Sequence, residues 1–427
     1  MFKICDALLA AQIFEKRRSD FRSYELKVRE ILDAVKLGGD KAVCEFIARF
    51  DGINLLPAQL KVSEAELTAA YASTEPEVIA ALEEAANNIY NFHAKQKHHS
   101  WMEPEEDGRI LGQIVRAVER AGVYVPGGTA AYPSSVLMNV IPAKVAGVKE
   151  IVMITPALKD GSVNSTALAA AKIAGVTEIY RVGGAHGIAA LAYGTEFIRK
   201  VDIITGPGNI YVTVAKKLVF GEVQIDMLAG PSEILIIADE TANVKYLAAD
   251  LLSQAEHDVL AASILVTTSR EVAEMVIAET QAQLNLLPRK DIASKSIDNF
   301  GAIFLVNDLD EAVKLANDFA PEHLEIITAE PFALIGKITN AGAIFVGPYS
   351  PEPVGDYWAG PNHILPTGGS ARFYSPLNVD TFMKKTSIIY YTRKALQESG
   401  QKIITLAEKE GLHAHANAIA LRLMKEV

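Results

Sequence analysis

Hydrophobic and polar positions alternate with a helical period through the first hundred residues of the chain. Apolar side chains recur three and four positions apart, which predicts helices over residues 24–50, 64–73 and 76–99. The first of these is interrupted at residues 38–40, where the sequence Gly-Gly-Asp weakens a helix. This helical region is preceded by a short N-terminal arm, residues 1–21.

The pattern changes at about residue 115, where short, continuous apolar runs begin to alternate with helical stretches. Runs of this kind are typical of buried strands, and several of them end in a glycine-containing turn. Strands that alternate with helices indicate parallel α/β sheets, whose ligands bind at the carboxyl ends of the strands. The runs that we expect to form strands are residues 123–125, 150–155, 178–182, 201–205, 233–239, 263–267, 301–306, 324–327 and 343–346.

The strands fall into two series, which predict an α/β fold with two Rossmann-like parallel-sheet domains. The usual glycine fingerprint is missing, because Gly206-Pro207-Gly208 has no third glycine at the required spacing, so the pattern alone does not predict NAD. The predicted division is an N-terminal arm of residues 1–21, a first, discontinuous α/β domain of residues 22–122 and 233–378, a second α/β domain of residues 123–232 and a C-terminal helical domain of residues 379–427.

Composition narrows the class of protein. The 427 residues carry a formal net charge of −11, which argues against nucleic acid or an anionic membrane as the main partner. No apolar stretch approaches about 18 residues and no signal peptide is evident, so we expect a soluble, cytoplasmic protein. The two cysteines, Cys5 and Cys44, are too few for a disulfide framework or a four-cysteine zinc site.

Polar residues with metal-binding chemistry gather near the end of the helix that the apolar pattern predicts over residues 243–257. Gln254 and His257 lie three positions apart and share one face, which is off the apolar stripe of that helix. Taken alone, such a pair is more often a solvated helix end than a metal site. Imidazole, carboxylate and amide oxygen are nevertheless suitable zinc donors. A second polar pair, Glu322 and His323, follows Pro321, which we expect to end a helix.

Eight short motifs are spread along the chain. They are Tyr124-Val-Pro-Gly-Gly, Tyr132-Pro-Ser-Ser-Val-Leu-Met-Asn139, Asp226-Met-Leu-Ala-Gly-Pro-Ser-Glu233, Ser253-Gln-Ala-Glu-His257, Ala320-Pro-Glu-His-Leu324, Val354-Gly-Asp-Tyr357, Asn362-His363 and Glu410-Gly-Leu-His-Ala-His415. In this order, and over the chain from about residue 31 to its end, they resemble the histidinol dehydrogenase family. Each motif is weakly specific alone, whereas the set is highly specific.

The resemblance implies an NAD-dependent oxidoreductase of histidine biosynthesis, which converts L-histidinol to L-histidine through the aldehyde with two hydride transfers. It also implies one zinc ion per subunit and a cytoplasmic homodimer, in which the C-terminal zinc ligand reaches the site of the other subunit. The roles carried over are catalysis for Glu322 and His323, zinc binding for Gln254, His257, Asp356 and His415, substrate binding for Ser232, Gln254, His257, His323, Asp356, Glu410 and His415, and cofactor binding for Tyr124, His186 and Asn209.

One position departs from the family pattern. Position 186 is usually glutamine, and the imidazole of His186 cannot reproduce both hydrogen bonds of an amide group. Cys5 and Cys44 lie outside every motif, which disfavours a covalent thiol route for oxidising the aldehyde. The resemblance therefore implies that His323 takes the proton of the alcohol and that Glu322 activates water.

Three other functions remain open on the sequence. A sister enzyme would oxidise a different small alcohol, although Ser232 and Glu410 favour an amino-alcohol, since a carboxylate suits a cationic ligand. A zinc-binding or nucleotide-binding module would have no activity, against which the intact pair of Glu322 and His323 argues. A structural α/β protein would use none of its histidines.

Overall fold

The structure, a computed structural model, divides into two compact units. The first comprises Met1–Gln96 with Val118–Phe382, and the second Lys97–Ala117 with Met383–Val427. No helix in the described part of the chain is long and apolar enough to cross a membrane. The residues that the structure describes are 2–6, 10, 14–15, 21–127 and 132–424.

Six parallel strands form the larger sheet of the first unit. In spatial order they are β1 (Ile4–Asp6), β11 (Ala302–Leu305), β10 (Ala262–Thr267), β9 (Glu233–Ala238), β12 (His323–Ile327) and β13 (Ala343–Val346). Strand β1 belongs to the predicted arm, most of which lies outside the described residues. In β9, Ile234 packs in one hydrophobic core and Leu235 in another, because successive side chains point to opposite faces of the sheet.

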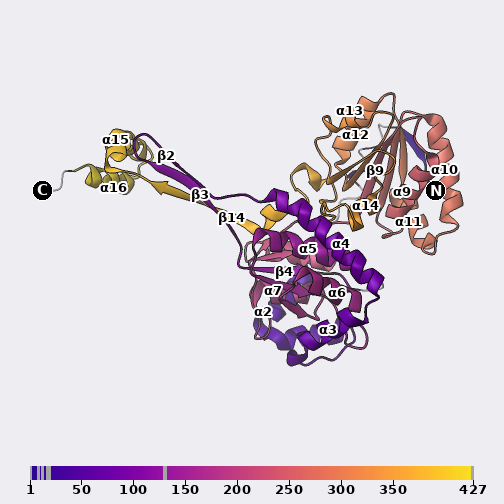
Figure 1. The fold of residues 1–427 in the computed structure, drawn as a ribbon, viewed down its shortest axis with the longest axis horizontal. Helices are drawn as coiled ribbons and strands as arrows, with labels where there is room; N and C mark the ends of the chain where they lie inside the picture. The colour runs from indigo at the N-terminus through magenta and orange to yellow at the C-terminus, as the bar shows by residue number, and fades with distance from the viewer. Residues whose placement is uncertain (1, 7–9, 11–13, 16–20, 128–131, 425–427) are drawn as a thin grey trace. The chain divides into compact units, whose positions relative to one another are not determined.

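Helices cover both faces of this sheet (Figure 1). The first core contains residues of α9 (Val244–Ala255), α10 (Arg270–Leu284) and α11 (Lys290–Phe300), and the second contains residues of α12 (Leu309–Phe319) and α13 (Phe332–Ile335). The short helix α14 (Glu352–Tyr357) follows β13. Strands buried on both faces explain the continuous apolar runs in the sequence.

Five parallel strands form the second sheet of the same unit. In spatial order they are β6 (Glu178–Tyr180), β5 (Glu150–Ile154), β4 (Arg120–Tyr124), β7 (Ile203–Thr205) and β8 (Gln224–Ile225). Its helices are α5 (Pro133–Ala146), α6 (Ser165–Ala174), α7 (Gly184–Tyr193) and α8 (Ile210–Val219). The prediction of two parallel sheets in an α/β fold is therefore confirmed.

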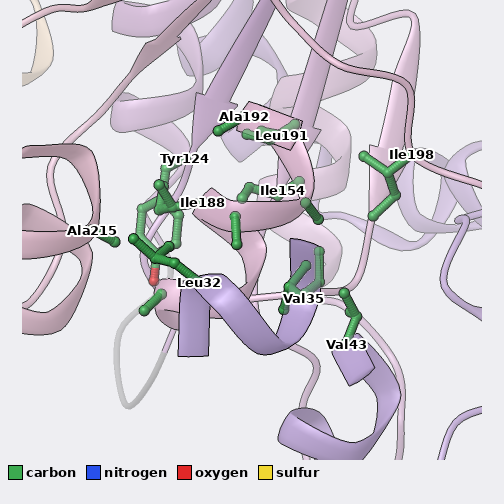
Figure 2. Packing of buried hydrophobic residues seen from close by; sticks show 14 of the residues in the cluster. Leu32, Val35, Val43, Tyr124, Ile154, Ile188, Leu191, Ala192, Ile198 and Ala215 are labelled. Atoms are coloured by element: carbon green, nitrogen blue, oxygen red, sulfur yellow. The ribbon is translucent and has the colours of Figure 1, made fainter. Parts of the chain in front are cut away.

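The N-terminal helices contact the helices that flank the second sheet, whereas the predicted grouping joins residues 22–122 with 233–378. They are α2 (Arg22–Phe50), α3 (Glu64–Ser73) and α4 (Pro76–His93). Helix α2 packs against α7 and α8, and Figure 2 labels Leu32 and Val35 of α2 in the same buried cluster as Ile188 of α7. The alanine-rich α7 permits this close approach. Sequence order alone cannot tell which of two sheets a helix covers.

A kink inside α2 confirms the predicted break. Gly39 has φ 54° and ψ −141°, a conformation that glycine adopts without the steric cost other residues meet. The predicted helix over 76–99 is too long, since α4 ends at His93 and a short 3-10 turn follows. The 3-10 turns are η2 (Pro57–Gln59), η3 (Ala94–Gln96), η4 (Ser370–Arg372) and η5 (Val379–Phe382).

The second unit contains an antiparallel sheet and a helical hairpin. The strands, in spatial order, are β14 (Met383–Tyr390), β3 (Ile110–Ala117) and β2 (Trp101–Pro104), and the helices are α15 (Arg393–Lys409) and α16 (His413–Leu423). The segment predicted as helical from residue 379 thus begins with a long strand. Its sequence, Met-Lys-Lys-Thr-Ser-Ile-Ile-Tyr, is rich in residues that favour strands, and β3 supplies the partner from far along the chain.

Candidate functional site

Glu322 and His323 lie at the amino end of β12. Their positions follow from the end of α12, where Ala320 has φ 50° and the chain passes directly to Pro321. The predicted helix end is therefore correct. His323 is the first residue of β12 and lies beside the amino end of β9. The turn that leads into β12, rather than a loop leaving a strand, presents the two side chains.

The backbone of Glu233 fixes the orientation of both side chains. Its N–H donates to Glu322 Oε2 at 2.9 Å, and its carbonyl oxygen lies 2.9 Å from His323 Nδ1. Because a carbonyl only accepts hydrogen bonds, Nδ1 carries the ring proton and Nε2 keeps a lone pair. Nε2 has no hydrogen-bond partner within the described residues and lies 3.9 Å from Asp356 Oδ1.

Burial favours the uncharged form of both members of the pair. Glu322 is 6% exposed and His323 is 3% exposed. Burial raises the pKa of Glu322 well above its usual value and lowers the pKa of His323 to about 4. A neutral imidazole with a free Nε2 lone pair can accept a proton. A carboxyl group with a raised pKa is, once ionised, a stronger base than an exposed carboxylate.

Helix α14 brings two carboxylates to His323. Glu352 and Asp356 lie four positions apart on one face, and one donor atom from each lies within 4.8 Å of the others and of a ring nitrogen of His323. The Glu352 N–H donates to Glu325 Oε1 at 2.9 Å, which anchors the start of the helix. Imidazole and carboxylate donors at this spacing suit a divalent cation. Sequence reasoning missed Glu352, although its position one helical turn before Asp356 was a usable signal.

Gln254 occupies an unusual environment at the end of α9. The side chain is fully buried, and neither its amide oxygen nor its amide nitrogen has a hydrogen-bond partner among the described residues. Leaving such a group unpaired costs roughly 1–3 kcal/mol, so its burial points to a ligand that binds there. Gln254 is therefore not part of a solvated helix end, which was the interpretation that the helical phase allowed.

His257 lies just beyond α9 and close enough to Asp356 for the charge of that carboxylate to act on it. Desolvation of the ring lowers the pKa of His257 below its usual value, although the residue as a whole is exposed. The charge of the nearby Asp356 opposes this shift without cancelling it. The charge of Asp356 also acts on His323. Of the four predicted zinc ligands, the first unit therefore contains Gln254, His257 and Asp356, all close to α9 and α14.

The remaining predicted residues of the substrate site lie in both units. Ser232 is half-buried and immediately precedes β9, where its carbonyl accepts from the Ala262 N–H at 3.0 Å. Glu410 follows α15 and His415 lies in α16, and both are exposed residues of the second unit.

The predicted cofactor residues lie at the carboxyl ends of the second sheet, where the sequence placed a ligand. Tyr124 ends β4, is 3% exposed and accepts from the Gly184 N–H at 3.4 Å, and burial raises its pKa to about 12. Asn209 follows β7 and caps α8, where its Oδ1 accepts from the N–H groups of Tyr211 and Val212 at 3.0 and 3.2 Å.

His186 lies in the first turn of α7 and is 2% exposed. Its ring lies against Phe46 and Phe50, with centroids 5.9 and 6.0 Å away. Neither ring nitrogen has a hydrogen-bond partner among the described residues. Burial lowers the pKa of His186 to about 4, so the ring is neutral near pH 7. A neutral ring offers one donor and one acceptor on separate atoms.

The similarity to known proteins extends over nearly the whole chain. The model of the histidinol dehydrogenase family matches residues 14–423. The histidinol dehydrogenase of Heliobacterium mobile is 58% identical over 97% of both chains, and that of Clostridium acetobutylicum is 56% identical over 92% of this chain and 91% of its own. The crystal structure of histidinol dehydrogenase from Elizabethkingia anophelis matches with a TM-score of 0.93 and 38% identity, covering 98% of this chain and 96% of that one. The chain therefore belongs to the histidinol dehydrogenase family.

Proposed function

We propose that this protein oxidises L-histidinol to L-histidine through the aldehyde, with two hydride transfers to NAD and one zinc ion per subunit. The observation that carries the proposal is the arrangement of Glu322 and His323 on the backbone of Glu233, with His323 Nε2 directed toward Asp356. Membership of the family gives the histidinol oxidation, and the geometry supports the finer roles of the residues.

His323 acts as the base for the alcohol in the first step. Its Nδ1 proton is held by the Glu233 carbonyl, so Nε2 is the nitrogen that takes the hydroxyl proton as hydride leaves the same carbon. NAD supplies the acceptor for that hydride. The same nitrogen serves again in the second oxidation, after its proton has been released.

Glu322 activates water for the second step. The aldehyde must add water before a second hydride can leave, and the resulting hydrate carries two hydroxyl groups on the reacting carbon. The raised pKa of Glu322 makes its carboxylate a stronger base than an exposed one, as activation of water requires. The Glu233 N–H fixes one oxygen, which leaves the other for the water.

Zinc fits the group of donors around α9 and α14. We propose Gln254, His257, Asp356 and His415 as its ligands, with His415 supplied by the second subunit of a homodimer. When bound, the ion would act as a Lewis acid that holds the substrate, and these residues would fix where it lies. The unpaired amide of Gln254 supports this site. The contacts that we propose for the substrate are Ser232, Gln254, His257, His323, Asp356, Glu410 and His415.

The cofactor site that we propose consists of Tyr124, His186 and Asn209. All three lie at carboxyl ends of the second sheet or at the helix starts that follow. The two unpaired nitrogens of His186 leave a donor and an acceptor for a ligand. We further propose that the enzyme works in the cytoplasm.

The test is NADH formation from L-histidinol by the purified protein, before and after treatment with a chelator. We expect two NADH per histidinol, loss of activity with the chelator and recovery with added zinc. NADH formation from another alcohol but not from L-histidinol would favour the sister enzyme. No NADH from any alcohol would refute the proposal and favour a binding module.

A further inference from the structure

A buried ion pair lies beneath the turn that follows β7. Lys216 of α8 pairs with Asp226, which comes directly after β8. Their side chains are only 3% and 1% exposed. Burying two charges costs several kcal/mol for each ion, and an apolar pair of similar size often gives equal or greater stability. Global stability is therefore a weak explanation for this pair.

Both charges also bind the backbone of one glycine. Lys216 Nζ donates to the Gly206 carbonyl at 2.9 Å, and the Gly206 N–H donates to Asp226 Oδ2 at 2.8 Å. Asp226 Oδ1 accepts a further bond from the Met227 N–H at 2.6 Å. The ion pair thus holds the peptide groups on both sides of Gly206. Hydrogen bonds to charged groups are shorter and stronger than neutral ones, so this attachment is firm.

Gly206 needs such an attachment, because its conformation is unusual and its surroundings are tight. Its φ is 110°, and an added Cβ would lie 2.1 Å from the carbonyl oxygen of Tyr124. Two residues later, a Cβ on Gly208 would lie 3.1 Å from the Tyr124 ring. The turn therefore runs against Tyr124 and leads directly to Asn209, the cap of α8.

We propose that Lys216 and Asp226 are positioning residues, which hold the turn of residues 206–209 in the geometry that binds the dinucleotide. This inference rests on the proposed function, since Tyr124 and Asn209 are two of the three proposed cofactor contacts. The pair reaches the cofactor only through the backbone of Gly206. It would act by fixing a turn in advance, so that binding does not have to order it.

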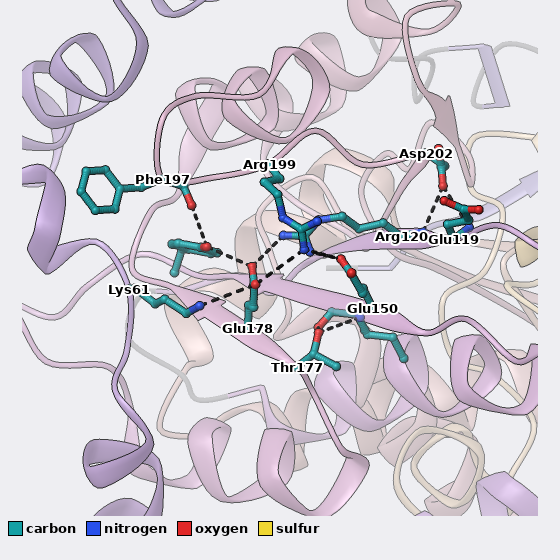
Figure 3. Close-up of polar contacts among 11 residues, drawn as sticks. Lys61, Glu119, Arg120, Glu150, Thr177, Glu178, Phe197, Arg199 and Asp202 are labelled. Atoms are coloured by element: carbon teal, nitrogen blue, oxygen red, sulfur yellow. Dashed lines mark hydrogen bonds and ion pairs between the residues drawn. The ribbon is translucent and has the colours of Figure 1, made fainter.

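The same sheet offers a matched control at its opposite edge. Arg120, at the amino end of β4, is 6% exposed and pairs with Glu150 and Glu178 at the amino ends of β5 and β6 (Figure 3). Arg120 is buried and charged like the first pair, although the Glu150 side chain is partly exposed, and the network lies at the edge away from the proposed cofactor residues. Its loss should lower stability without changing the affinity for NAD.

The experiment compares Lys216→Met, Asp226→Asn and the double variant with Glu178→Gln. Dissociation constants for NAD and for L-histidinol are measured by calorimetry on the zinc-loaded enzyme, together with KM and kcat. We expect NAD binding to weaken by about 10- to 100-fold in Lys216→Met and in the double variant, because fixing the backbone of one or two residues on binding costs a free energy of this order. Binding of L-histidinol should stay within about twofold, and Asp226→Asn should be the mildest, since its side-chain oxygen can still accept from Gly206.

Unchanged NAD affinity in Lys216→Met and in the double variant would overturn the inference. An equal loss in Glu178→Gln would also overturn it, because the effect would then be merely structural. If wild-type enzyme binds no NAD, the proposed function itself fails. If wild-type enzyme binds NAD and the variants bind it equally well, only the positioning role fails.

A second measurement uses only wild-type enzyme, so it tests the inference even if the variants do not fold. Hydrogen exchange of wild-type enzyme, followed by mass spectrometry of peptides over residues 203–212, reports on the turn directly. A turn held by the ion pair should exchange slowly without NAD and change little when NAD is added. Fast exchange that slows only with NAD would overturn the inference.

Discussion

His186 should leave a measurable signature in the proton balance of unfolding. The group is buried, and burial lowers its pKa to about 4, whereas an unfolded histidine titrates near 6.5. Between these two values the unfolded chain holds a proton at this position and the folded chain does not. The contribution of the buried, neutral imidazole to the free energy of unfolding is therefore fully present above about pH 6.5. It is lost as the pH falls toward about pH 4.

The magnitude follows from the two pKa values. At about pH 5.3, the unfolded imidazole is almost fully protonated and the folded one almost fully neutral, so unfolding takes up about 0.9 proton at this position. The corresponding loss of stability is about 1.4 kcal/mol per pH unit across this window, or about 3 kcal/mol in total. Replacement of His186 by Gln removes this contribution and keeps a polar side chain in the same place.

The assay measures the protons taken up when unbuffered protein is unfolded in guanidinium chloride, for wild type and for His186→Gln. The difference between the two should be about 0.9 proton at about pH 5.3 and near zero at about pH 8, where both states are neutral. The second pH is an internal control, because other groups contribute equally to both proteins. A difference below about 0.3 proton at the lower pH would show that the folded imidazole is accessible to protons and would refute the reasoning.

Two further variants test the proposed chemistry. His323→Asn should lower kcat by about 10²–10⁴-fold while zinc content stays unchanged, since a base at Nε2 is lost and the proposed ligands remain; turnover near that of wild type would rule out the role of base. Cys5→Ser combined with Cys44→Ser should leave kcat within about twofold, because burial raises the pKa of both thiols and so disfavours the nucleophilic thiolate; an inactive double variant would instead support a thiol nucleophile.

Local chemistry explains which elements the sequence predicted well. Helix α3 begins and ends at the predicted residues, and α10 and α12 begin in the same way. In each, the side chain of the residue before the first turn accepts a hydrogen bond from the backbone N–H three residues later. Ser63 accepts from Glu66, Ser269 from Val272 and Asp308 from Glu311. Such a cap involves residues only three apart, so it is visible in the sequence.

Non-local pairing explains what the sequence did not predict. Strand β14 pairs with β3 across more than two hundred residues, and its helix-like neighbours in sequence gave no sign of that partner. The same holds for α2, whose apolar face is clear in the pattern although either sheet could have covered it. A hydrophobic period reports that a face is buried and does not report against what.

The pair of Glu322 and His323 shows the same limit at the level of chemistry. Glu322 and His323 were found through a motif, but their orientation depends on the backbone of Glu233 in another strand. Backbone groups are present at every residue and carry no signature in the sequence. Tyr124 ends a strand and Asn209 follows one, which is where the rule for parallel sheets places ligands. His323 instead starts a strand, so the rule does not point to it.

Gln254 shows how a helix face off the hydrophobic stripe can still be buried. The phase of α9 places Leu251 and Leu252 in the core and turns the polar residues away from it. Away from the core need not mean toward water: Ser253 Oγ lies 3.5 Å from Glu352 Oε2, so α14 covers this part of the helix. A face covered by polar groups excludes water without pairing every donor and acceptor, and Gln254 is left with two unpaired atoms. Because leaving them unpaired costs free energy, selection for stability alone would have favoured an apolar residue here, and a polar ligand is the simplest reason for the glutamine.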